Sequence, residues 1–117
     1  MKQKALIIDD EFELCMLLKL YLIERGYEVA MAYNLKDGVN KIDSFNPSIV
    51  FLDNNLPDGS GWQLTQEILE HYPLIKISLI SSLRPSVPSS ISYENIFIME
   101  KPLSKREIDK CLFSLSA

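Results

Sequence analysis

Short apolar runs alternate along the chain with longer segments in which apolar residues recur every three or four positions. The short runs are typical of β-strands, and the recurring spacing is typical of helices that bury one face. The pattern predicts strands at 5–8, 27–31, 48–52, 75–80 and 96–99. It predicts helices over 14–21, 35–42 and 62–72, and a last helix after Ser104, where Glu107 completes a capping box.

Three of the predicted strands are continuous apolar runs, the pattern of strands that are covered on both faces. Strands that alternate with helices favour a parallel sheet with helices on both sides, and right-handed crossovers leave few strand orders open. The sequence therefore predicts an α/β fold with a doubly wound, five-stranded parallel sheet. Residues 54–61 are rich in Asn, Pro, Asp and Gly and are expected to form a loop.

Composition narrows the class of protein. A length of 117 residues suits one domain, so residues 1–117 are expected to form a single domain, with no output domain in this chain. Hydrophobic residues make up 47% and charged residues 24%, as in folded globular chains. The formal net charge of −4 disfavours nucleic-acid binding. No run approaches the ~20 apolar residues that span a bilayer, so we expect a cytoplasmic protein without membrane contact.

Chemically useful side chains follow four of the predicted strands. Asp9 and Asp10 come after the first strand, and Asp53 comes after the third. Ser81 and Lys101 follow the fourth and fifth strands. Because the carboxyl ends of parallel strands share one edge of the sheet, where ligands of such folds bind, we expect these side chains to converge on one small site.

The negative charges of clustered carboxylates need to be offset. Two of them about 4 Å apart repel by about 4 kcal/mol at an effective dielectric constant of ~20, which calls for a cation or for raised pKa values. Oxygen ligands without histidine or cysteine favour Mg²⁺ over zinc. Mg²⁺ ordinarily takes one or two protein carboxylates, which leaves another free as a nucleophile toward a phosphoryl group. Lys101 would stabilise the transferring charge, and the Ser81 hydroxyl would donate a hydrogen bond to it.

These residues, in this order, resemble the motifs of the response regulator receiver domain (CheY-like) of two-component signalling. The marks are Asp9-Asp10, Asp53 with the following residues 54–61, Ser81, and Lys101-Pro102. Each mark is weak alone, but together, each at a strand end, they make a strong signal. The resemblance covers essentially the whole chain and implies a flavodoxin-like sheet with the strand order 2-1-3-4-5.

The resemblance also implies roles for individual residues. Asp53 would be the phospho-acceptor, assisted by Lys101 and Ser81. Mg²⁺ would be bound by Asp10, Asp53 and the backbone carbonyl of Asn55, and by Asp9 through a water molecule. The phosphoryl donor would be a phosphohistidine on a sensor histidine kinase or phosphotransfer protein. A conformational change would carry the signal to a downstream protein or output domain, so the chain would not be an enzyme beyond slow self-dephosphorylation.

Residues 82–95 depart from the family, which usually has a helix between the fourth and fifth strands. The segment contains Pro85, Pro88 and five serines, and a proline inside a helix costs about 3 kcal/mol. The sequence therefore predicts a loop with at most a short helical turn, which leaves open the partner and whether the chain forms a homodimer. A second departure is Ile98, where the family often places an aromatic residue that moves on phosphorylation.

Other interpretations stay open at this point. One is a receiver-fold interaction module that is never phosphorylated, which the unusual segment 82–95 motivates. Another is a phosphatase or phosphotransferase, which is disfavoured because Asp53-x-Asn55 lacks the second aspartate typical of such phosphatases. Glu11 either helps the metal shell or favours the N-terminus of the first helix. Asp58 is interpreted as a turn residue, with a role in access to the site as the alternative.

Overall fold

The main sheet of the computed structural model has five parallel strands in the order β2-β1-β3-β6-β7. The model describes residues 2–82 and 94–116. The strands are β1 (Lys4–Ile8), β2 (Glu28–Ala32), β3 (Ile49–Asp53), β6 (Lys76–Ser81) and β7 (Ile96–Glu100). The helices are α1 (Phe12–Glu24), α2 (Leu35–Phe45), α3 (Gly61–His71) and α4 (Lys105–Ser116). The predicted α/β fold and strand order 2-1-3-4-5 are confirmed.

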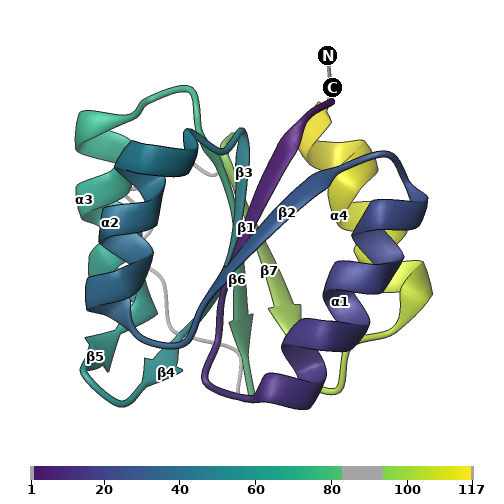
Figure 1. The fold of residues 1–117 in the computed structure, drawn as a ribbon, viewed down its shortest axis with the longest axis horizontal. Coiled ribbons are helices and arrows are strands. Elements are labelled where there is room, and N and C mark those ends of the chain that lie inside the picture. Colours follow the sequence, from purple (N-terminus) through teal and green to yellow (C-terminus); the bar gives the residue numbers. More distant parts are fainter. Residues whose placement is uncertain (1, 83–93, 117) are drawn as a thin grey trace.

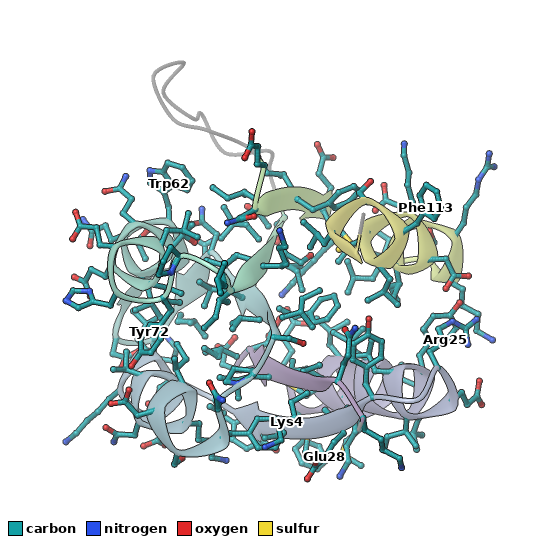
Figure 2. The ribbon with its side chains drawn as sticks, turned by 90° about the horizontal axis from the view of Figure 1, so that it is seen from above. Lys4, Arg25, Glu28, Trp62, Tyr72 and Phe113 are labelled. Atoms are coloured by element: carbon teal, nitrogen blue, oxygen red, sulfur yellow. The ribbon has the colours of Figure 1, made fainter. Side chains whose placement is uncertain are left out.

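Helices cover the sheet on both faces, with α2 and α3 on one side and α1 and α4 on the other (Figure 1). Successive residues of β1 belong to opposite cores: Ala5 packs in the core beneath α1 and α4, and Leu6 packs in the core beneath α2 and α3. Viewed from above, side chains fill the space on each side of the sheet (Figure 2). Burial on both faces is the reason that the central strands are continuous apolar runs.

The helix ends follow the local signals in the sequence. Gly26 follows α1 with a φ of 90°, a backbone conformation that glycine adopts without a steric penalty. The Asn34 side chain caps α2 by accepting a hydrogen bond from the backbone N–H of Asp37 at 2.8 Å. Before α4, Ser104 Oγ accepts from the N–H of Glu107 at 3.1 Å, as expected from the capping-box pattern.

The prediction of a loop at 54–61 was wrong in one detail. The segment contains an antiparallel hairpin of two very short strands, β4 (Asn55–Leu56) and β5 (Gly59–Ser60). Strands of two residues are too short to give the alternating pattern by which strands are recognised in a sequence. Leu56 is buried in the core beneath α2 and α3, so the hairpin is anchored to the body of the domain.

Two further expectations concern the segment 82–95 and the absence of a membrane span. The loop predicted at 82–95 falls mainly on residues 83–93, which lie outside the described residues. Within the ranges 2–82 and 94–116, none of the helices is long and apolar enough to cross a membrane.

Candidate functional site

The carboxyl ends of the strands meet at one edge of the sheet, the lower edge in Figure 1. Asp53 is the last residue of β3 and Ser81 is the last residue of β6, while Asp9 directly follows β1. Backbone hydrogen bonds hold the neighbouring residues in place. The N–H of Asp9 donates to the carbonyl of Ala32 at 3.0 Å, and the N–H of Lys101 donates to the carbonyl of Ser81 at 2.9 Å. The sheet thus carries these residues to a common edge.

Three carboxylates form a compact cluster at this edge. Asp9, Asp10 and Asp53 each offer one oxygen atom, and these atoms lie within 4.8 Å of one another. Asp9 and Asp53 are only 0% and 3% exposed, whereas Asp10 is exposed to solvent. One side of the cluster is therefore enclosed by protein and the other is open to a ligand from solution.

Lys101 brings a positive charge to the cluster. Its Nζ atom lies 3.4 Å from Asp9 Oδ2 and 3.6 Å from Asp53 Oδ2. It also donates a hydrogen bond of 2.7 Å to Glu11 Oε1. Burial alone would lower the pKa of the Lys101 ammonium, but the hydrogen bond to Glu11 and the charges of Asp9 and Asp53 raise it above its usual value. The lysine therefore remains charged at neutral pH.

Each buried carboxylate is oriented by a backbone N–H two residues further along the chain. Asp9 Oδ1 accepts from Glu11 at 2.9 Å, and Asp53 Oδ1 accepts from Asn55 at 3.1 Å. Burial raises the pKa of Asp9 to about 6, with the hydrogen bond from Glu11 opposing this effect. Burial also raises the pKa of Asp53, against the hydrogen bond from Asn55 and the charge of Lys101. Removing water from these carboxylates makes their negative charge costly unless a cation binds.

The donor set fits a divalent metal ion. Among the described buried side chains, Asp9 Oδ2 is left without a hydrogen-bond partner, and the Lys101 ammonium lies 3.4 Å from it as an ion pair. A hard cation in the cluster would bind such carboxylate oxygens and offset their mutual repulsion. Asp9, Asp10 and Asp53 could therefore hold a metal such as Mg²⁺.

The segment after Asp53 folds closely over the end of β3. The N–H of Gly61 donates to the carbonyl of Asn54 at 3.0 Å, and the N–H of Trp62 donates to Asn54 Oδ1 at 2.9 Å. A Cβ atom at position 61 would lie 2.2 Å from the carbonyl oxygen of Asp53. Only glycine leaves room for this approach, so Gly61 shapes the backbone that carries Asp53.

The structure brings the predicted site residues to one edge but gives some of them different surroundings. Ser81 is 2% exposed at the end of β6, whereas Asn55 is an exposed residue of β4. The sequence offered two interpretations of Glu11, and its hydrogen bond to Lys101 belongs to neither of them. A pair that is 90 residues apart leaves no local signal in the sequence.

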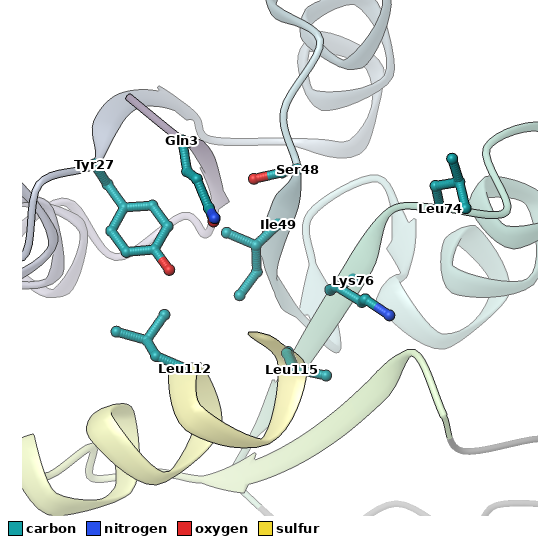
Figure 3. Close-up of a pocket in the computed structure, with 8 residues that line it drawn as sticks. All are labelled: Gln3, Tyr27, Ser48, Ile49, Leu74, Lys76, Leu112 and Leu115. Atoms are coloured by element: carbon teal, nitrogen blue, oxygen red, sulfur yellow. The ribbon is translucent and has the colours of Figure 1, made fainter. Parts of the chain in front are cut away.

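A cavity of about 300 Å³ lies away from this cluster, at the opposite edge of the sheet (Figure 3). Tyr27, Ser48 and Lys76 line it together with Leu112 of α4. Of the described residues that line this cavity, none carries a carboxylate. The cluster of Asp9, Asp10 and Asp53 is therefore separate from this cavity.

Comparison with known proteins agrees with this geometry. The family model of the response regulator receiver domain matches residues 5–113. The regulatory protein VanR of Enterococcus faecium is 36% identical over 80 residues, which are 67% of this chain and 35% of VanR. The match thus spans about a third of the length of this curated relative.

Solved structures show the same fold. A CheY-like receiver domain from Methylobacillus flagellatus superposes with a TM-score of 0.83 at 25% identity, covering 98% of this chain and 99% of that one. The response regulator TrrA from Thermotoga maritima, in complex with Mg(2+)-BeF, gives a TM-score of 0.81 at 29% identity and covers 97% and 98%. Since the family model also matches nearly the whole sequence, this chain belongs to the response regulator receiver domain family of two-component signalling, whose members are phosphoryl acceptors rather than catalytic enzymes.

Proposed function

We propose that this receiver domain accepts a phosphoryl group on Asp53 in an Mg²⁺-dependent reaction and signals by a change of conformation. The observation that carries the proposal is the position of Asp53. Its buried carboxylate ends the middle strand of the sheet, within the same 4.8 Å cluster as Asp9 and Asp10 and 3.6 Å from the Lys101 ammonium.

The proposed reaction is a transfer between two protein side chains. An Asp53 carboxylate oxygen attacks the phosphorus atom of a phosphohistidine, a new O–P bond forms and the P–N bond breaks. The leaving imidazole nitrogen keeps the electron pair of the broken bond and takes up a proton. An ionised carboxylate needs no general base, so the chain has only to position Asp53 and to stabilise charge on the transferring group.

Mg²⁺ would be held by Asp10, Asp53 and the backbone carbonyl of Asn55, with Asp9 acting through a bound water. When bound, the ion would neutralise negative charge on the carboxylates and on the phosphoryl oxygens. An oxygen-only donor set, in which the buried Asp9 Oδ2 lacks a hydrogen-bond partner, supports this assignment. The complex of the similar TrrA with Mg(2+)-BeF supports it as well.

Lys101 and Ser81 would recognise the phosphoryl group. The ammonium of Lys101, already 3.6 Å from Asp53 Oδ2, would move onto a phosphoryl oxygen. The Ser81 hydroxyl would donate a hydrogen bond to another phosphoryl oxygen and couple it to the backbone after β6. Tighter binding of the phosphoryl group in one arrangement of these residues would shift the population of the domain toward that arrangement.

The family implies a histidine kinase as partner, and we propose a sensor histidine kinase or a phosphotransfer protein as the donor, meeting this domain in the cytoplasm. Because the match spans 35% of the regulatory protein VanR, we propose that the signal passes to a segment outside residues 1–117 or to a separate protein.

Intact-mass measurement tests this function. With Mg²⁺ and acetyl phosphate, the wild type should gain the mass of one phosphoryl group. Asp53→Asn, or chelation of Mg²⁺, should abolish the gain. Asp37→Asn, which alters an exposed acid of α2, should be phosphorylated like the wild type. An unchanged mass would leave a receiver-fold interaction module as the better description, and an equal gain in Asp53→Asn would refute Asp53 as the acceptor.

A further inference from the structure

Asp58 lies at the turn of the β4–β5 hairpin, but its side chain bonds to a different element. Its Oδ1 atom accepts a hydrogen bond from the backbone N–H of Leu35 at 2.8 Å, and its Oδ2 atom accepts from Lys36 at 3.1 Å. These are the first two residues of α2. The interpretation of Asp58 as a turn residue described its place and missed this contact across more than twenty residues of chain.

The first turn of α2 is thus capped by two different parts of the chain. The Asn34 side chain accepts a hydrogen bond from the N–H of Asp37 at 2.8 Å, while Asp58 accepts from the N–H groups of the two residues that precede Asp37. Helix N-termini carry partial positive charge, so an ionised carboxylate is favoured there. The hydrogen bonds from Leu35 and Lys36 hold the pKa of Asp58 below its usual range, which keeps the carboxylate charged at neutral pH.

Apolar contacts reinforce the same attachment. Leu56 of β4 is buried in the core against which Leu35 packs. At Gly59, the first residue of β5, an added Cβ atom would lie 2.8 Å from Leu35 Cδ1. The hairpin is therefore held directly on the first residue of α2, by a charged group on one side of the turn and by close packing on the other.

The same hairpin begins at the acidic cluster. Asn55 is the first residue of β4, and its N–H donates to Asp53 Oδ1 at 3.1 Å. Two residues separate Asn55 from Asp58, so the attachment at Asp58 restricts the conformations open to the Asn55 backbone. We propose that Asp58 is a positioning residue, which fixes the hairpin on the N-terminus of α2 so that the carbonyl of Asn55 is held ready for the cation at Asp10 and Asp53.

This role rests on the proposed function, because it assigns the Asn55 carbonyl to the Mg²⁺ site. Without Asp58 the hairpin would sample more conformations, and the cation would have to order it on binding. Partners that orient metal ligands in this way typically change metal affinity by 10–100-fold when they are removed. Since Asp58 acts through the backbone of an exposed hairpin, we expect the lower end, about tenfold.

Asn34 provides a matched control. Asn34→Ala removes a cap from the same helix turn but leaves the hairpin attachment intact, whereas Asp58→Ala removes both a cap and the attachment. Mg²⁺ affinity is measured by isothermal titration calorimetry, and stability is measured by urea unfolding of the metal-free proteins. Asp58→Ala should weaken Mg²⁺ binding about tenfold, while Asn34→Ala should lower stability and keep Mg²⁺ affinity within about twofold of the wild type.

Asp58→Asn extends the test to a variant of the same shape. Its amide oxygen still accepts a backbone hydrogen bond but carries no charge, so its Mg²⁺ affinity should fall between those of the wild type and Asp58→Ala. At saturating Mg²⁺ the phosphorylation rate of both Asp58 variants should return to within about twofold of the wild type, because the reacting groups are untouched.

The outcomes separate the two proposals. Equal Mg²⁺ affinities for wild type, Asp58→Ala and Asp58→Asn, in a wild type that is phosphorylated on Asp53, would overturn the role of Asp58 and leave the proposed function standing. An equal loss of affinity in Asn34→Ala would overturn it too, because helix capping alone would then explain the effect. A wild type that gains no phosphoryl group would instead refute the proposed function.

Discussion

The Nζ atom of Lys101 lies 2.7 Å from Oε1 of Glu11, so an exposed carboxylate beside α1 shares the lysine with the buried acidic cluster. The lysine is farther from its buried partners, at 3.4 Å from Asp9 and 3.6 Å from Asp53. Glu11 therefore competes with any phosphoryl group on Asp53 for the same ammonium.

Removing this competition should tighten binding of a phosphoryl analogue. Glu11→Gln keeps the size of the side chain but weakens its hold on Lys101. Exposed ion pairs contribute about 0.2–1 kcal/mol, so the affinity for beryllium fluoride in the presence of Mg²⁺ should rise by up to about fivefold. Titration of tryptophan fluorescence from Trp62 measures this. Glu13→Gln makes the same change of charge one residue into α1 and should leave the affinity unaltered; an equal gain in that control would point to net charge rather than to Lys101.

The metal-free domain should lose stability as the pH rises through about 6. The pKa of Asp9 is raised by burial from 3.8 to about 6, so the folded state binds a proton that the unfolded chain has already released. Protonation of Asp9 contributes fully to the free energy of unfolding below pH 3.8, and this contribution is lost above pH 6. Between pH 5 and pH 7.5 this amounts to about 1 kcal/mol, measured by urea unfolding in EDTA.

Asp9→Asn provides the control for this pH dependence. The variant should be more stable than the wild type at pH 7.5 in EDTA, and its stability should change less with pH. Mg²⁺ should stabilise the wild type most at pH 7.5, where the carboxylates are ionised. An Asp9→Asn protein with the pH profile of the wild type would show that other groups titrate in this range.

Lys101→Met should strengthen Mg²⁺ binding and slow phosphorylation. Loss of the ammonium leaves Asp9 and Asp53 uncompensated, so Mg²⁺ should bind severalfold more tightly in calorimetric titrations. Phosphorylation by acetyl phosphate should slow by about 100-fold, because a donor aimed at the transferring charge is gone. Lys105→Met, which removes an exposed charge at the start of α4, should change neither quantity. Weaker Mg²⁺ binding in Lys101→Met would contradict the electrostatic explanation.

Gly61→Ala should damage the site through the backbone. The new Cβ atom would lie 2.2 Å from the carbonyl oxygen of Asp53. Because that oxygen belongs to the main chain, the clash can be removed only by shifting the backbone. Overpacking of this kind costs about 1–3 kcal/mol, and here it should also weaken Mg²⁺ binding. Gly26→Ala is the control, since its φ of 90° makes alanine costly by about 1–2 kcal/mol far from the site, with nothing within 4 Å. Unfolding and Mg²⁺ titrations should separate them; unchanged Mg²⁺ affinity in Gly61→Ala would refute the prediction.

Much of the fold could be predicted because buried positions are occupied by apolar residues, whose spacing can be read in the sequence. Strands with apolar neighbours on both faces appear as continuous apolar runs, and every strand of the main sheet begins and ends within one residue of its predicted bounds. The topology then determines which strand ends share an edge. For this reason Asp53, Ser81 and Lys101 could be expected at one edge of the sheet before any distance was known.

Polar contacts between distant segments could not be predicted in this way. The hydrogen bonds that Asp58 accepts from the first amides of α2 depend on the path of a hairpin whose strands are only two residues long. The hydrogen bond between Lys101 and Glu11 depends on side-chain conformations at the ends of two strands. Neither contact alters the spacing of apolar residues, so no periodicity in the sequence reports it.

The acidic site draws its members from the first, middle and last strands of the chain. No contiguous fragment shorter than most of the domain contains both Asp9 and Lys101, so a partly folded chain would lack the ammonium beside the carboxylates. The phosphorylation rate, rather than cation affinity, would consequently report completed folding, because only the reaction depends on the ammonium that the last strand of the main sheet delivers.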